Sequence, residues 1–256
     1  DRVFVCSVMR VWRSMKAQDG RAKQHQDNMY AGVDYPDRGG SFVETYYIRD
    51  ADMNLAKIPE GVTLEQAVMV PDMMCTAFEG VQALNMRFGQ SVAVLGVGPV
   101  GLMAVRAAVL QGAGNIFAIG SRQVCFDVAK EFGATHLIDY HNDNYIDQIH
   151  QENDGPVDNV VLCGGSEKEL SLGLEMLKNG GTLVNLSAYF SNASIPIQPA
   201  VWDFGYGDKT IKGVGCGGGR LLLSRMAQLI ASGRVAPEKL ITHRYHGMDK
   251  IPGAMN

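Results

Sequence analysis

From about Gln90 onward, short and almost wholly apolar runs alternate with runs whose apolar residues recur at helical spacing. The apolar runs predict buried strands over Ser91–Leu95, Ile116–Ile119, His136–Ile138, Val157–Leu162 and Thr182–Leu186. The intervening runs predict helices over Pro99–Leu110, Gln123–Phe132, Asn144–Gln151 and Glu167–Leu177. Strands and helices that alternate in this way are typical of a parallel sheet covered on both faces, so we expect a doubly wound α/β fold.

Outside this region the pattern is weaker. Val3–Val5 and Ser41–Ile48 predict strands by their β-branched and aromatic content, and the polar stretch from Ser14 to Gly40 between them predicts a long loop. A helical pattern begins at Leu64, and Pro71 is expected to kink it.

The last part of the chain holds a cluster of glycines between positions 213 and 219, followed by a helix predicted over Leu221–Ser232. We interpret the cluster as the point where the chain crosses between two domains. The chain opens as if within a strand and closes as if a helix were starting, so we expect a piece of a longer protein.

Composition narrows the class of protein. The 256 residues are 46% hydrophobic and 20% charged, the balance of a globular protein with a sizeable core. A net charge of −4 offers no general attraction to nucleic acid or to an anionic membrane. The longest uncharged apolar run, Val92–Val105, is too short and too rich in glycine to span a bilayer. Five cysteines without a CxxC pair predict neither a disulfide framework nor a structural zinc site, and they favour the cytoplasm.

The most informative motif is Gly96-Val97-Gly98-Pro99-Val100-Gly101, which follows one predicted strand and opens the next predicted helix. The first glycine permits a tight turn, the second lets a pyrophosphate approach the backbone, and the third lets helix and strand pack closely. The alternative, a glycine-rich turn within the core, does not account for the strand–helix units that follow. The motif predicts a Rossmann dinucleotide-binding domain.

The end of the second predicted strand indicates which dinucleotide binds. It reads Ile119-Gly120-Ser121-Arg122, with no carboxylate before Asp127 to bind a ribose 2′-hydroxyl. Gly120 leaves room for a 2′-phosphate, Ser121 can donate to it, and Arg122 can pair with it through two hydrogen bonds. Tyr140, after the third strand, can reach the same group or be an ordinary strand-end tyrosine. The sequence therefore predicts NADP.

Ser187, Ala188 and Tyr189 follow the predicted strand Thr182–Leu186. Because ligands of open α/β sheets bind beyond the carboxyl ends of the strands, this loop is expected to line the nicotinamide half of the site.

Several strings together resemble one family, the zinc-dependent medium-chain alcohol dehydrogenases, and within it the NADP-dependent secondary alcohol dehydrogenases of bacteria and protozoa. The matching strings are Asp50–Ala56, Ala67–Met74, Val94–Ala104, Ile119–Arg122, Lys209–Gly213 and Gly217–Leu221. The resemblance covers nearly the whole chain.

The resemblance implies a mostly β, GroES-like catalytic domain, incomplete here, around the cofactor domain. Residues 1–75 and 217–256 would belong to the catalytic domain and residues 76–216 to the cofactor domain. The family's catalytic zinc is held by a cysteine, a histidine and an aspartate. The aspartate matches Asp72, and the other ligands would precede Asp1. Without the resemblance, Asp72 would be interpreted as a capping or solvated residue, and a zinc site rebuilt from Cys6, Cys75 and His25 is a minor alternative.

The activity implied by the resemblance is zinc-assisted hydride transfer between NADP and small secondary alcohols or ketones, in a homo-oligomer, commonly a tetramer. Neither nucleic acid nor a membrane is an expected partner. Two alternatives stay open: another substrate, such as a polyol, an amino-alcohol or an aldehyde, and a fragment that binds NADPH without catalysis.

Overall fold

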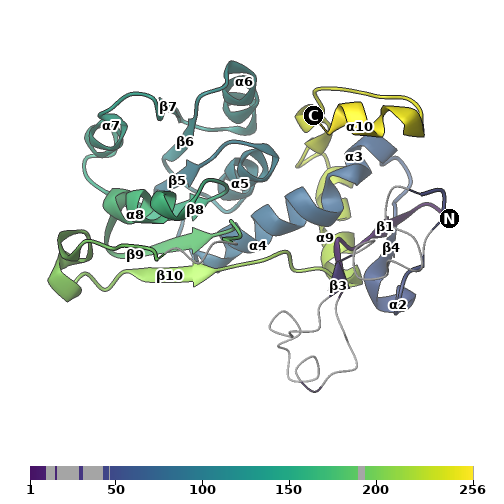
Figure 1. The fold of residues 1–256 in the computed structure, drawn as a ribbon, viewed down its shortest axis with the longest axis horizontal. Coiled ribbons are helices and arrows are strands. Elements are labelled where there is room, and N and C mark those ends of the chain that lie inside the picture. The colour runs from purple at the N-terminus through teal and green to yellow at the C-terminus, as the bar shows by residue number, and fades with distance from the viewer. Residues whose placement is uncertain (10–14, 16–28, 31–42, 46, 190–193, 256) are drawn as a thin grey trace. The chain divides into compact units, whose positions relative to one another are not determined.

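The computed structural model describes residues 1–9, 15, 29–30, 43–45, 47–189 and 194–255 (Figure 1). The chain forms two compact units. One comprises Thr76–Gly215, and the other comprises Asp1–Cys75 together with Cys216–Asn256.

The Thr76–Gly215 unit is built on one six-stranded parallel sheet (Figure 1). Its strands are β5 (Val92–Leu95), β6 (Ile116–Gly120), β7 (His136–Asp139), β8 (Val157–Leu162), β9 (Leu177–Asn185) and β10 (Thr210–Gly213). Their spatial order is β10-β9-β8-β5-β6-β7. The order reverses between β5 and β8, which makes that junction the switch point of a doubly wound fold. The predicted α/β fold class is confirmed.

The helices of this unit are α4 (Cys75–Ala83, beginning one residue before it), α5 (Pro99–Leu110), α6 (Gln123–Phe132), α7 (Tyr145–Glu152), α8 (Glu167–Met176) and the 3₁₀ segment η4 (Pro199–Gly205). Helix α5 packs on α6, and α7 packs on α8. The sequence predicted α5 to α8 to within a residue at each end. It missed β10 and placed the start of β9 too late.

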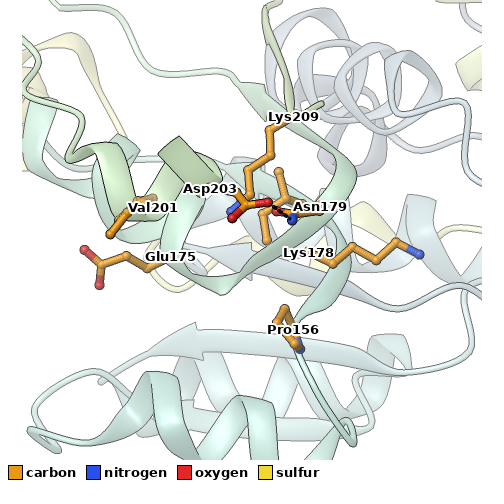
Figure 2. A pocket seen from close by; sticks show the side chains of 9 residues that line it. Pro156, Glu175, Lys178, Asn179, Val201, Asp203 and Lys209 are labelled. Atoms are coloured by element: carbon orange, nitrogen blue, oxygen red, sulfur yellow. Dashed lines mark hydrogen bonds between the residues drawn. The ribbon is translucent and has the colours of Figure 1, made fainter. Parts of the chain in front are cut away.

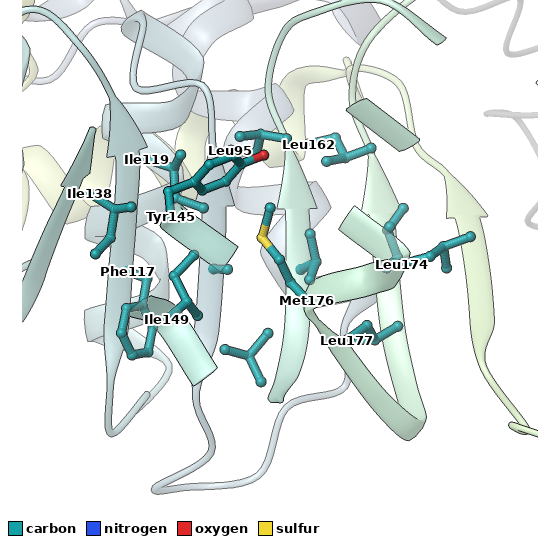
Figure 3. Packing of buried hydrophobic residues seen from close by; sticks show 14 of the residues in the cluster. Leu95, Phe117, Ile119, Ile138, Tyr145, Ile149, Leu162, Leu174, Met176 and Leu177 are labelled. Carbon is teal, nitrogen blue, oxygen red and sulfur yellow. The ribbon is translucent and has the colours of Figure 1, made fainter. Parts of the chain in front are cut away.

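The core of this unit lies where α7 and α8 cover the sheet. Figure 3 shows Tyr145 and Ile149 of α7 facing the side chains of β6 and β7. The largest fully buried members of the cluster are Phe117, Ile119, Ile138, Ile149, Leu162, Leu174, Met176, Leu177 and Leu183. Strands β5 and β6 are buried at every position, as expected for strands covered on both faces.

Asp158 joins the amino ends of the central strands. Its carboxylate accepts hydrogen bonds from the Ser91 amide (2.8 Å) and the Ser91 hydroxyl (2.9 Å), and it pairs with Lys178. Burial raises the pKa of Asp158, but the hydrogen bonds from Lys178 and Ser91 outweigh this effect and hold the pKa below its ordinary value. The ionised carboxylate therefore stabilises the fold.

We expect Asp158→Ala to lower the free energy of unfolding by about 2 kcal/mol at pH 7, the usual worth of hydrogen bonds to a charged group. Because the folded-state pKa is lowered, this contribution is complete above the unfolded carboxyl's pKa of about 3.9 and is lost as the pH falls through the folded value. Urea unfolding from pH 7 down to pH 3 measures both effects. The exposed Asp147→Ala is the control, and an equal loss in both variants would contradict the assignment.

The other unit holds two small antiparallel strand pairs, β1 (Val3–Val5) with β4 (Leu55–Lys57) and β2 (Val8–Met9) with β3 (Met29–Tyr30). Its remaining elements are α2 (Ala51–Asn54), α3 (Leu64–Val68), the π-helical turn η3 (Val70–Met74), α9 (Arg220–Ala231), η5 (Pro237–Leu240), η6 (Met248–Lys250) and α10 (Ile251–Ala254). The kink expected at Pro71 is present as the π-helical turn between α3 and α4.

One strand prediction is wrong. Residues 43–45 and 47–48 form no strand, and Val43 and Tyr47 are exposed. β-Branched and aromatic residues form a strand only where a neighbouring strand pairs with them, and none of the described strands pairs with this segment. Ser41, Phe42 and Tyr46 lie outside the described residues, as does most of the predicted loop Ser14–Gly40, of which Met29–Tyr30 is strand β3.

Candidate cofactor-binding site

The glycine-rich motif forms a tight turn between β5 and α5. Gly96 has a φ of +94°, a left-handed conformation that glycine adopts without strain. A Cβ atom at Gly101 would lie 1.8 Å from the carbonyl oxygen of Gly96, so only glycine lets the helix approach the turn this closely. A Cβ atom at Gly98 would meet nothing within 4 Å. The space above Gly98 is therefore open to a ligand.

Helix α5 presents its amino end at this turn. Gly98 is the N-cap residue and provides no side-chain cap, and Pro99 occupies the first turn. The first turn of a helix leaves amide groups unpaired and carries a partial positive charge, which together favour a phosphate. The predicted roles of Gly96, Gly98 and Gly101 are compatible with this geometry, and Val97 and Val100 complete the turn.

Gly120 and Ser121 shape the neighbouring strand end. A Cβ atom at Gly120 would lie 2.3 Å from Cγ2 of Val97, so a glycine is required where β6 passes the turn. The hydroxyl of Ser121 donates to the hydroxyl of Tyr140 at 3.1 Å. The structure thus brings together two residues that lie 19 positions apart and that the sequence predicted for one site.

Arg122 lies at the N-cap of α6 with an exposed side chain. Within the described part of the chain, its guanidinium has no ion-pair or hydrogen-bond partner. The Ser121–Tyr140 hydroxyl pair and this arginine form a polar surface at the carboxyl ends of β6 and β7.

A cavity of about 420 Å³ lies at the carboxyl ends of β5, β7 and β8. Its lining residues are Leu95, Gly96, Tyr140, Tyr145, Gly164, Gly165, Glu169 and Leu172. Ligands of open α/β folds bind at this edge, at the switch point between β5 and β8. The sequence predicted Gly96 and Tyr140 as site residues but missed Gly164, Gly165 and Glu169. A pair of glycines one residue after a buried strand was the available signal.

The loop after β9 is organised by Asn185, which sequence reasoning also missed. Its side chain accepts from the Ser187 amide (3.1 Å) and donates to the Ser187 carbonyl (2.9 Å). The hydroxyl of Tyr189 donates to the side-chain oxygen Oδ1 of Asn185 at 3.2 Å. The hydroxyl of Ser187 is buried and has no hydrogen-bond partner among the described residues, while Ala188 is exposed.

Asp72 lies in the π-helical turn of the other unit, with an exposed side chain. Three buried thiols, Cys6, Cys75 and Cys216, lie in this unit. A hydrogen bond with Cys216, together with burial, raises the pKa of the Cys75 thiol far above its ordinary value. The Cys216 thiol donates to the Pro71 carbonyl at 3.4 Å, and the Gly219 amide donates to Cys6 Sγ at 2.9 Å. The buried thiols in these contacts act as packing groups.

No group of three His, Cys, Asp or Glu side chains within the described ranges is arranged to hold a metal ion. The alternative zinc site of Cys6, Cys75 and His25 includes His25, which lies outside the described residues, so that alternative stays a prediction.

A second cavity, of about 610 Å³, lies at the amino ends of β8, β9 and β10 (Figure 2). Several of its polar groups are held by hydrogen bonds within the protein: Asn179 donates to Asp203 at 3.0 Å, and the Lys209 ammonium donates to the Leu174 carbonyl at 2.8 Å. Burial lowers the pKa of Lys209, and the nearby Asp203 opposes that shift. This edge is opposite to the one where such sheets bind ligands, so we interpret the cavity as structural.

Six parallel strands in this order, with a glycine-rich turn opening the helix after the first of them, define a nucleotide-binding domain of the dehydrogenase type. The family model described as zinc-binding dehydrogenase matches residues 99–232. The chain belongs to the zinc-binding dehydrogenase family.

Individual relatives agree with this assignment. The chain is 42% identical over 256 residues to an NADP-dependent isopropanol dehydrogenase of Thermoanaerobacter brockii, covering 99% of this chain and 72% of the relative. It is 40% identical over 257 residues to the corresponding enzyme of Clostridium beijerinckii, covering 100% of this chain and 73% of that one. Among solved structures, alcohol dehydrogenase TADH from Thermus sp. ATN1 superposes with a TM-score of 0.85 at 28% identity, covering 99% of this chain and 74% of that one. The family resemblance predicted from the sequence is confirmed.

Within the described residues, no helix has the length and apolar character needed to cross a membrane.

Proposed function

We propose that the protein is an NADP-dependent oxidoreductase that interconverts small secondary alcohols and ketones. The observation that carries the proposal is the hydrogen-bonded pair of Ser121 and Tyr140 beside the exposed guanidinium of Arg122. These groups suit a 2′-phosphate, which NADP has and NAD lacks. The names of the relatives, NADP-dependent isopropanol dehydrogenases, support the same cofactor and substrate class.

Bound NADP would supply the hydride-accepting nicotinamide ring. The chain's own residues bind and orient it. The amino end of α5 and the open backbone at Gly98 receive the pyrophosphate, and Arg122 pairs with the 2′-phosphate. When the phosphate binds, the Ser121 hydroxyl turns away from Tyr140, and both hydroxyls donate to the phosphate. We assign Ser187, Ala188 and Tyr189 to the nicotinamide half, and the buried hydroxyl of Ser187, which has no partner in the described part of the chain, supports that role.

We propose Asp72 as one ligand of the family's catalytic zinc. Its exposed carboxylate supports the assignment, and a carboxylate is an accepted zinc ligand. One carboxylate does not hold zinc alone, and the described residues supply no complete ligand set. In the same proposal, residues 1–75 and 217–256 belong to the catalytic domain and residues 76–216 to the cofactor domain.

A homo-oligomer, of tetrameric form in the family, is the proposed assembly, in the cytoplasm. Strand β10 borders the sheet with β9 as its only strand neighbour among the described residues, and Ile211 on it is 37% exposed. An unpaired strand edge is a template for a second copy of the chain. The five free thiols are compatible with a reducing compartment. The mass of the protein in solution tests the assembly.

We expect Arg122→Gln to weaken NADPH binding by about tenfold to a hundredfold, because a charge-assisted bidentate pair is lost, and to leave NADH binding within about twofold. Fluorescence titration of the protein with each nucleotide measures both dissociation constants. Lys130→Gln removes the same charge from the last turn of α6 and is the matched control. An equal effect of Arg122→Gln on NADH would contradict the 2′-phosphate assignment.

The substrate class is tested by comparing kcat/KM for 2-propanol and 2-butanol with values for a polyol, an amino-alcohol and an aldehyde, in the presence of zinc and NADP. A higher value for the secondary alcohols is expected. A higher value for one of the others would reassign the substrate, and tight NADPH binding without any turnover would support a binding protein without catalytic activity.

A further inference from the structure

A carboxylate lies unexpectedly close to the proposed 2′-phosphate site. Asp139 is the last residue of β7, and in the parallel register its Cα pairs with that of Gly120, directly before Ser121 and Arg122. A hydrogen bond from the backbone of His141 holds the pKa of Asp139 below its ordinary value, against a raising effect of burial, with the His141 ring adding to the lowering. Asp139 is therefore an anion beside a site proposed for a second anion, and the two repel each other.

His141 hydrogen-bonds to the Asp139 carboxylate through both its backbone and its ring. Its backbone amide donates to Oδ1 of Asp139 at 3.0 Å, and its ring Nδ1 lies 2.9 Å from the same oxygen. The ring also lies against the ring of Tyr140, with centroids 4.5 Å apart and planes inclined by 39°. Because the hydroxyl of Tyr140 bonds Ser121, the imidazole is one aromatic ring away from the proposed phosphate-binding hydroxyls.

We propose that His141 is a specificity-determining residue for NADP, acting in its protonated form: the imidazolium neutralises Asp139 and adds positive charge beside the groups that bind the 2′-phosphate. This inference rests on the proposed function. Imidazole is the side chain whose charge changes between about pH 5 and pH 8. Above that range Asp139 is left uncompensated, so the preference for NADPH over NADH falls as the pH rises.

Other charged groups near His141 do not account for a pH-dependent preference for NADPH over NADH that differs between His141 variants. The charged groups of the adjoining elements are Arg122 at the N-cap of α6, Asp127 and Glu131 on α6, Asp143 in the following loop, and Asp147 and Glu152 on α7. All of them are the same in every variant compared below, so a difference between variants reports on His141. Two other histidines lie on packed elements, but His136 begins β7 and His150 is in the last turn of α7, each at the far end of its element.

The 2′-phosphate itself loses its second proton near pH 6, and this acts in the opposite direction, because the dianion binds Arg122 more strongly. The effect of His141 is therefore isolated by comparing variants at each pH rather than by the profile of the wild type alone.

The experiment measures dissociation constants for NADPH and NADH by nucleotide fluorescence between pH 5.5 and pH 8.5. It uses the wild type, His141→Gln, His141→Lys and the control His136→Gln. At pH 6 we expect His141→Gln to reduce the NADPH/NADH preference by about threefold to tenfold, the effect of one charge at this range near a protein surface. By pH 8.5 wild type and His141→Gln converge, whereas His141→Lys keeps the high preference and His136→Gln follows the wild type.

Equal preferences for wild type and His141→Gln at every pH would overturn the role of His141 while leaving the NADP assignment intact. A His141→Gln effect that is the same for NADH and NADPH would also overturn it, because NADH carries no 2′-phosphate. A wild type without any preference for NADPH at any pH would overturn the proposed function and this inference together.

Discussion

Replacing Gly98 by valine is expected to abolish nucleotide binding in a protein that still folds. The backbone at Gly98 has φ −74° and ψ −168°, a conformation open to any residue, and a Cβ atom there meets no neighbour within 4 Å. The same open space is where the pyrophosphate must approach the amino end of α5. We expect both NADPH and NADH to bind at least about a hundredfold more weakly, because several phosphate hydrogen bonds are lost together.

Two measurements check this result: nucleotide titration, and thermal unfolding, where the midpoint should stay within about 2 °C of the wild type. Gly253→Val, at another glycine whose Cβ atom would meet nothing, is the control for binding. Unchanged affinity in Gly98→Val would reject the proposed position of the pyrophosphate.

Gly101→Ala, unlike Gly98→Val, is expected to destabilise the fold itself. Its Cβ atom would lie 1.8 Å from the Gly96 oxygen and 2.9 Å from the Gly96 carbonyl carbon. Both are backbone atoms, so α5 must move away from the turn after β5. We expect the free energy of unfolding to fall by about 3 kcal/mol or more, at the upper end of overpacking effects.

Urea unfolding measures that loss, with Gly98→Ala, three residues away, as the matched control that should stay within about 0.5 kcal/mol of the wild type. If the variant does not fold, its absence from the soluble fraction beside a soluble Gly98→Ala supports the same conclusion. A Gly101→Ala protein as stable as the control would mean that the turn and the helix are not in close contact.

Within the Thr76–Gly215 unit, the sequence predicted helices and strands well where several local signals mark the same boundary. Helix α5 begins at Pro99 after an extended glycine, and α6 ends before Gly133 in a left-handed conformation, so both boundaries were visible in the residues. Strand β10 was missed because it has four residues and three of them are exposed. What makes it a strand is parallel pairing with β9, a contact that no local pattern encodes.

The residues of the candidate site also fall into two groups, those that local sequence signals indicate and those that only the folded structure brings together. Gly96, Gly98, Gly101, Ser121 and Arg122 could be proposed from the sequence because they adjoin buried strands in a fixed motif. Asn185 was not, because its role is to hold the backbone of Ser187 through two hydrogen bonds that exist only once the loop has folded back. The pairing of Asp139 with His141 was equally invisible, since two residues at that spacing face each other only where the chain turns at the end of β7.

The contact between Gly120 and Val97 bears on how the nucleotide preference of this protein can evolve. An aspartate at the end of the second strand is the usual means of selecting NAD, but any side chain at position 120 would place its Cβ atom 2.3 Å from Cγ2 of Val97. Val97 is only 4% exposed, and its branched side chain has little rotational freedom with which to yield. A change at position 120 is therefore harmful until position 97 has become smaller, whereas the change at 97 alone brings no new specificity. The two substitutions are epistatic, and this ordering constrains the mutational path away from NADP.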